Sequence, residues 1–111
     1  MGQLAPLSKK CEEMKLGSLI NKYLGYGHFK LSEYSKCIAA YQRIKIADMD
    51  ESSTYNRLLA EGIELADRHH RFPEAIGKFN QAKAVYPQKV EPYIYIAMTI
   101  ILKRNQAPDH D

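Results

Sequence analysis

The sequence predicts an all-α fold of about five helices, and three observations favour this class. Apolar residues recur at three- and four-residue spacing along most of the chain, which is the period of an amphipathic helix. No segment alternates polar and apolar residues for long enough to indicate a strand. A helical segment in the first half also returns in the second half at a constant offset, which indicates that the helices form pairs.

Each expected helix has its own apolar face, and a polar turn or a proline separates it from the next. Ser32 is expected to cap the second helix, because a serine side chain can accept a bond from a free N–H of the first turn. Pro73 and Pro92 suit the first turns of the last two helices, where no N–H partner is lost. The expected helical segments are residues 16–29, 34–47, 53–66, 73–85 and 90–104.

Three glycines, Gly17, Gly25 and Gly27, lie within the first expected helix. Each weakens a helix by up to about 1 kcal/mol relative to alanine. We therefore expect a neighbouring element to pack closely against this helix at the glycines and to compensate for that loss.

Composition places the chain among single-domain globular proteins. It has 111 residues, of which 45% are hydrophobic and 26% charged, with a net charge of +3. Two cysteines exclude a disulfide framework, and unpaired thiols favour a cytoplasmic location. The apolar run 92–102 is too short to span a membrane, and the N-terminus does not resemble a signal peptide.

A small residue followed four places later by an aromatic residue marks the repeated segment. Such spacing suits two antiparallel helices, because the small side chain allows a close approach and the ring fills the neighbouring gap. The equivalent residues, each 38 positions apart (72 − 34), are Tyr34 and Phe72, Cys37 and Ala75, and Tyr41 and Phe79.

The segment Ala75-x3-Phe79, followed by Ala82 and Pro87, resembles the second half of a tetratricopeptide (TPR) repeat. The resemblance covers roughly residues 14–104, with a flexible N-terminal segment at 1–13 and a polar tail at 105–111. It implies antiparallel helix-turn-helix pairs stacked as a short right-handed superhelix.

An earlier unit resembles the same repeat through Leu24-Gly25 and Cys37-x3-Tyr41. It departs from the repeat pattern at His28, Cys37 and Met49, where an aromatic residue, an alanine and a proline are usual.

The second unit allows two alignments, on Gly62 or on Ala75, which differ by one residue. We favour Ala75, because it keeps Glu61 and Glu64 out of the core. This alignment places inside the core Leu59, Gly62, Ile63 and Ala66. The fifth helix resembles the opening helix of a third unit, and the residues expected to face inward there are Tyr93, Ile96, Ala97 and Ile100.

The resemblance implies a non-catalytic module or adaptor for protein–protein interaction, with a concave groove lined by the first helix of each pair. The expected partner is a helix or an extended peptide. Phe29 and Ala60 belong to the same expected face, although Phe29 and Ile101 have the alternative of facing the core. The expected partner-binding residues are Lys22, Tyr26, Lys30, Arg57, Glu64, Ile94, Tyr95, Met98, Ile101 and Leu102.

The last helix is apolar nearly all round, which is typical of a helix buried on more than one side. With no sixth helix to cover it, we expect one face to bind a partner or to self-associate. The alternative is that residues 1–15 fold back over it, with Leu4 and Leu7 as apolar cover.

A specialised TPR subclass binds the C-terminal carboxylates of chaperones through paired cations and an asparagine. Lys22 suits one such position, but Tyr26 replaces the asparagine, and Glu91 and Tyr95 stand where cations are needed. Because Glu91 would repel a carboxylate, we expect no binding of this kind.

The alternative function is binding of nucleic acid, in particular RNA, by the first helix pair. Residues 1–30 contain five lysines and two glutamates, and Tyr23, Tyr26 and Phe29 are available to stack on bases. No basic stripe continues along the later helices, so this function is not the one we favour.

Signals for catalysis, metals or cofactors are weak, so the sequence does not predict an enzyme. Adjacent His69 and His70 point about 100° apart on a helix and do not form a chelating pair. His28 and Cys37 occupy packing positions of the repeat, where buried structural roles are expected. We expect no metal and no cofactor.

Overall fold

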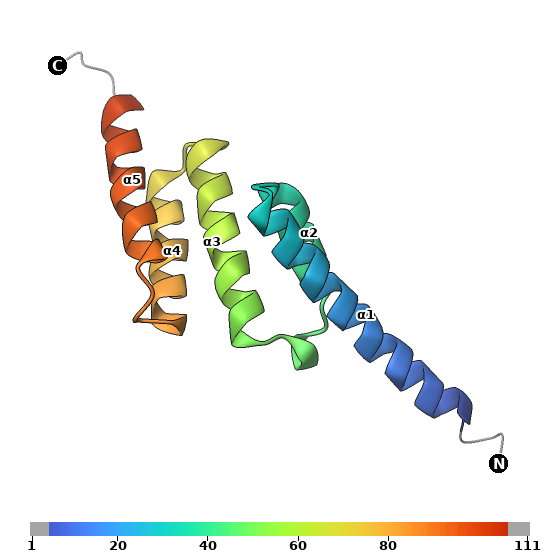
Figure 1. Cartoon of the computed structure of the whole chain (residues 1–111). Coiled ribbons are helices and arrows are strands. Elements are labelled where there is room, and N and C mark those ends of the chain that lie inside the picture. The colour runs from blue at the N-terminus through green and yellow to red at the C-terminus, as the bar shows by residue number, and fades with distance from the viewer. Residues whose placement is uncertain (1–4, 107–111) are drawn as a thin grey trace.

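A computed structural model describes residues 5–106, with side chains for residue 13 and residues 15–105. The molecule is elongated, with principal extents of 76 × 26 × 20 Å (Figure 1). The described part of the chain contains no strand, which confirms the all-α prediction. It consists of α1 (Ala5–Lys30), α2 (Tyr34–Gln42), a short 3₁₀ helix η1 (Ile46–Asp48), α3 (Glu51–Asp67), α4 (Phe72–Val85) and α5 (Glu91–Gln106).

Each helix from α1 to α5 packs against the next one in the sequence. In addition, α3 contacts both α1 and α5. In Figure 1, α3, α4 and α5 stand side by side, while the α1–α2 pair lies at the other end of the molecule. Because α1 lies far from α5 and extends away from it, the first helix does not cover the last one as the fold-back alternative required.

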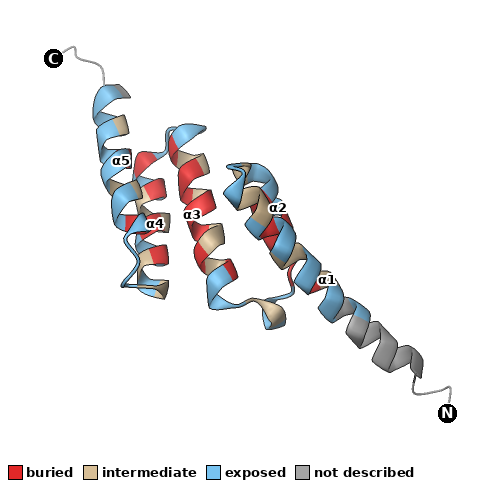
Figure 2. Cartoon of the chain, viewed as in Figure 1, coloured by how far each residue is buried: buried red, intermediate tan, exposed pale blue. Residues whose placement is uncertain are grey.

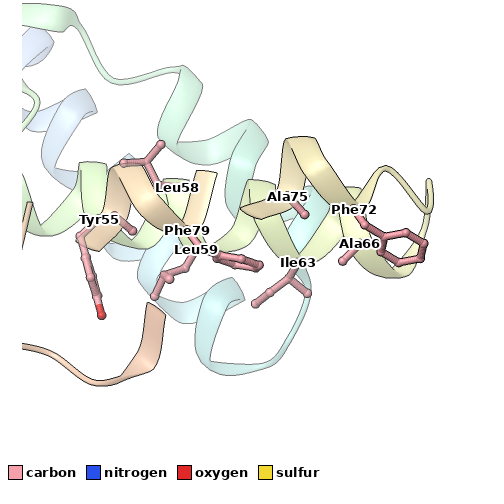
Figure 3. Close-up of a cluster of buried hydrophobic side chains, with 9 residues drawn as sticks. Tyr55, Leu58, Leu59, Ile63, Ala66, Phe72, Ala75 and Phe79 are labelled. Carbon is pink, nitrogen blue, oxygen red and sulfur yellow. The ribbon is translucent and has the colours of Figure 1, made fainter. Parts of the chain in front are cut away.

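Two clusters of buried apolar side chains hold the helices together, and red residues in Figure 2 mark them on α2, α3 and α4. The larger cluster joins α3 to α4 (Figure 3), and its members are Tyr55, Leu58, Leu59, Ile63, Ala66, Phe72, Ala75, Phe79 and Ala82. A smaller cluster joins α2 to α3, and its members are Cys37, Tyr41, Ile44 and Ala60. Phe29 and Tyr34 pack against both clusters, and α3 supplies residues to both, so α3 joins the α3–α4 pair to the α1–α2 pair.

A glycine in the first helix of each pair lies under an aromatic ring of the second. A Cβ built on Gly25 would lie 2.5 Å from the ring of Tyr41, and one built on Gly62 would lie 2.5 Å from the ring of Phe79. No atom lies within 4 Å of a Cβ built on Gly17 or Gly27, so the expected close packing holds for Gly25 alone.

These two contacts correct the alignment that the sequence favoured. In the second pair, Gly62 occupies the place that Gly25 has in the first. The extra residue lies in the loop between the paired helices, which covers residues 68–71 between α3 and α4 and only residues 31–33 between α1 and α2. The residues expected inside the core, Ile63 among them, are buried. The loop absorbs the extra residue because a surface turn changes length more easily than a packed helix.

Ser32 does not cap α2 as predicted. It adopts a left-handed conformation with φ of 61° and ends α1, where the N–H of Glu33 donates to the carbonyl of His28 at 2.8 Å. Glu33 holds the N-cap position, but its side chain forms no capping bond to α2. The same role after α3 falls to His70, with φ of 53°.

Several boundaries differ from the expected ones. Helix α1 begins at Ala5, so residues 5–13 continue the first helix, while residues 1–4 and 107–111 lie outside the described residues. Helix α2 ends at Gln42, because Ile44 turns into the smaller cluster. Helix α3 begins at Glu51, because the carboxylate of Asp50 accepts a bond from the N–H of Ser53 at 2.7 Å.

Substitution of the glycines tests the contact between paired helices. Gly25→Ala and Gly62→Ala are each expected to lower the free energy of unfolding by about 1–3 kcal/mol, because the added methyl group clashes with a buried ring. The matched controls Gly27→Ala and Gly77→Ala meet open space and are expected to raise it by about 0.5–1 kcal/mol through helix propensity. Urea denaturation of the four variants measures both effects, and a loss of stability in the controls would contradict this account.

Candidate partner-binding groove

A hollow of about 390 Å³ opens between α5 and the end of α3. Of its eleven lining residues, helix α5 supplies six, α3 three, and α2 and α4 one each. We call it the groove, and its lining residues are Tyr34, Ile63, Ala66, Asp67, Phe79, Tyr95, Met98, Thr99, Ile101, Leu102 and Asn105. Four of the ten expected partner-binding residues therefore meet here, namely Tyr95, Met98, Ile101 and Leu102.

Phe79 and Tyr95 join the groove to the core. The two rings stack with centroids 5.4 Å apart and an interplanar angle of 18°. Burial raises the pKa of the Tyr95 phenol, and the nearby Tyr34 and Glu91 raise it further. Tyr95 is thus half-buried and contributes to the packing of α5 as well as to the groove wall.

The rotation of α5 also differs from the prediction. Of the four residues expected to face inward, only Ile96 packs against the core, whereas Tyr93, Ala97 and Ile100 are exposed. The sequence analysis did not place Thr99 inside, but Thr99 is buried, and its hydroxyl donates to the carbonyl of Tyr95 at 2.7 Å. Because a helical threonine can satisfy its hydroxyl on the carbonyl four residues earlier, the sequence is compatible with Thr99 on the buried side of α5.

The rim of the groove combines exposed apolar side chains with one carboxylate. Met98 is 56% exposed and Ile101 is 58% exposed. Asp67 is exposed beside them, and its carboxylate forms no hydrogen bond or ion pair with the residues that the structure describes. Asp67 is also the last residue of α3, where the helix dipole is negative, so both features favour a cation at this edge.

The expected polar groove residues are held by other side chains. Lys22 forms an ion pair with Asp50 at 3.1 Å. Arg57 pairs with Glu61 at 2.8 Å within α3. Because these charges are already matched inside the chain and do not line the groove, the structure does not bring them together as a binding site.

Glu64 accepts bonds from Ser35 at 2.8 Å and from Arg68 at 3.3 Å, which link α3 to the start of α2. The ammonium of Lys30 lies 5.4 Å from the centroid of the Tyr26 ring. Neither Glu64 nor this lysine–tyrosine pair lines the groove.

Ile94 is exposed but lies outside the groove lining. Ala60, expected on the concave face, is fully buried in the smaller cluster between α2 and α3, so it has no surface to offer a ligand. The tight contact between the two helix pairs explains its position.

The histidines and Cys37 do not converge on a reaction centre in the described part of the chain. Nδ1 of His28 lies 2.8 Å from Oε1 of Glu33, and this bond lowers the pKa of the Glu33 carboxyl. Cys37 is completely buried, and burial, with the charge of Glu61, raises the pKa of its thiol to about 12. No group of three metal-ligating side chains lies together in the described residues.

No helix in the described part of the chain combines the length and the apolar character that crossing a membrane requires.

Stability should fall at alkaline pH because of Cys37 and Tyr41. Their pKa values rise from 9.0 and 10.0 to about 12, mainly through burial, so the folded state keeps protons that the unfolded chain releases. The stabilisation is complete below pH 9 and is lost as the pH rises towards 12. Urea midpoints measured from pH 7 to pH 11 should decline less steeply in Cys37→Ala than in the unmodified chain, and parallel curves would contradict the assignment to this thiol.

The TPR resemblance rests on the sequence motifs alone. No protein-family model, curated protein or solved structure matches this chain. The TPR resemblance therefore stays a prediction from the quoted motifs.

Proposed function

We propose that the chain is a non-catalytic protein–protein interaction module that binds an apolar segment of a partner in the groove. One observation carries this proposal, namely an open apolar hollow of about 390 Å³ with exposed Met98 and Ile101 on its rim. Exposed apolar side chains around a concave surface are typical of interaction sites, because their burial by a partner is favourable.

The unpaired carboxylate of Asp67 favours a partner segment with a positive charge. A lysine or arginine of the partner would meet both this carboxylate and the negative end of the α3 dipole. The hollow is large enough for one or two large side chains, and its lining, which includes the rings of Tyr34 and Tyr95, suits an aliphatic or aromatic residue. The proposed partner segment thus carries an apolar anchor with a basic residue near it.

The repeat resemblance supports the same function, because TPR arrays display their first helices to protein segments. The contacts of α1 with α3 and of α3 with α5 are consistent with such stacking. As part of this proposal we place the module in the cytoplasm, since the free and fully buried thiol of Cys37 suits a reducing compartment.

Binding of RNA is the alternative, and one observation favours it, the 71% exposure of Tyr23 on α1. The neighbouring cations argue against it, because Lys22 is paired with Asp50 and Lys30 lies over Tyr26. The groove is therefore the surface that we favour.

A pull-down from cell extract, with and without nuclease, tests the proposed function. A defined protein should bind the unmodified chain in both arms and should lose at least tenfold in recovery with Met98→Asp, because a carboxylate then enters an apolar hollow. Asp67→Lys should weaken recovery through charge reversal.

The matched control is Ile46→Asp, which places the same charge on an exposed apolar residue of η1 that does not line the groove. It should leave the recovery unchanged. Material that disappears with nuclease, or recovery that is insensitive to Met98→Asp, would contradict the proposed function.

A further inference from the structure

The internal repeat shows what normally covers the first helix of a pair. Gly25 on α1 lies under the ring of Tyr41 from α2, and Gly62 on α3 lies under the ring of Phe79 from α4. In both pairs a small residue thus receives an aromatic ring from an adjacent helix.

Helix α5 carries a comparable surface without a cover. Ala97 is small and exposed, and the aromatic and aliphatic residues one turn before and after it, Tyr93 and Ile100, are 50% and 47% exposed. We call Tyr93, Ala97, Ile100 and Arg104 the outer face of α5, because their spacing of four, three and four residues places them along one side of the helix. Met98 and Leu102 lie on the other side, in the groove.

Positive charge flanks the outer face. Arg104 stands at one end of it, and the ammonium of Lys83 from α4 lies 4.9 Å from the centroid of the Tyr93 ring at the other. Neither cation forms an ion pair with another side chain that the structure describes. An apolar strip between two unmatched cations is complementary to an apolar strip bordered by carboxylates.

We propose that the outer face of α5 binds an acidic amphipathic helix of another protein, with an aromatic ring of that helix lying on Ala97. The bound helix would take the place that α2 and α4 take in the two complete pairs. Its ring sits further from the helix axis than in those pairs, because Ala97 keeps the methyl group that Gly25 and Gly62 lack. This surface is centred on a different side of α5 from Met98 and Leu102, and it meets the groove only where Ala97 and Ile101 are neighbours one turn apart.

A second copy of this chain is a poorer occupant on grounds of charge. Its α1 offers exposed apolar residues such as Leu16 and Ile20, but residues 1–30 contain five lysines against two glutamates. Its own outer face again presents Lys83 and Arg104. Both surfaces would bring like charges together, which disfavours association.

Synthetic peptides based on α4 provide a defined probe, because this helix already places a ring on Gly62. The acidic peptide has the sequence of residues 72–85 with Lys78→Glu and Lys83→Glu. One control peptide keeps both native lysines. The other control is the acidic peptide with the further change Phe79→Ala. Titration by fluorescence anisotropy should show binding of the acidic peptide, at least about tenfold weaker binding of the native-charge peptide, and loss of binding without the ring. Added salt should weaken the acidic complex.

Variants of the full chain assign the site. In Ala97→Leu, the leucine side chain fills the space proposed for the partner's ring and should reduce binding of the acidic peptide more than about tenfold. The circular dichroism spectrum should stay unchanged, because Ala97 is exposed. Arg104→Glu should abolish the preference for the acidic peptide. Met98→Asp, in the groove, should leave binding of the acidic peptide unchanged. These variants therefore distinguish a wrong assignment of the groove from a wrong assignment of the outer face.

Two results would overturn the proposal. One is the absence of saturable binding of the acidic peptide, or binding that Ala97→Leu leaves intact. The other is a concentration-dependent dimer, seen by analytical ultracentrifugation and lost with Ala97→Leu, because a second copy would then occupy the outer face.

Discussion

The close contact between a glycine and an aromatic ring is the constraint on which the rest of this structure depends. Phe79 reaches α3 because Gly62 has no side chain, and the ring then lies among the buried residues that join α3 to α4 (Figure 3). Tyr41 and Gly25 do the same for α1 and α2. Both contacts set the distance between paired helices, and α3, which supplies residues to both buried clusters, joins one pair to the other.

The groove follows from this arrangement of the core. The face of Phe79 that α3 leaves open carries the stacked ring of Tyr95, and α5 is thereby held beside the end of α3. The bond from the Tyr55 hydroxyl to Glu91, at 3.3 Å, ties the beginning of α5 to the beginning of α3. A hollow remains between the far ends of the two helices, where Met98 and Ile101 stay exposed next to Asp67.

Helix α5 combines two surfaces because it is apolar nearly all round and only one of its sides is covered. Its buried side contains Pro92 and Thr99, and its exposed sides carry the groove residues and the outer face. Opposite charges border these surfaces, a carboxylate at the groove and cations at the outer face. The two proposed sites therefore select partner segments of opposite charge.

The sequence by itself determined the helical class, the pairing of the helices and the buried positions of residues such as Cys37 and Phe79, because these depend on side-chain spacing along one helix. It identified Met98, Ile101 and Leu102 as groove residues, but it also selected Lys22, Arg57 and Glu64, whose charges are matched by residues distant in sequence or on the same helix face. Only the tertiary structure decided the rotation of α5. A helix with apolar residues on every side has no preferred buried face of its own, so its contacts with α3 and α4, among them the stack of Tyr95 on Phe79, determine which side is covered.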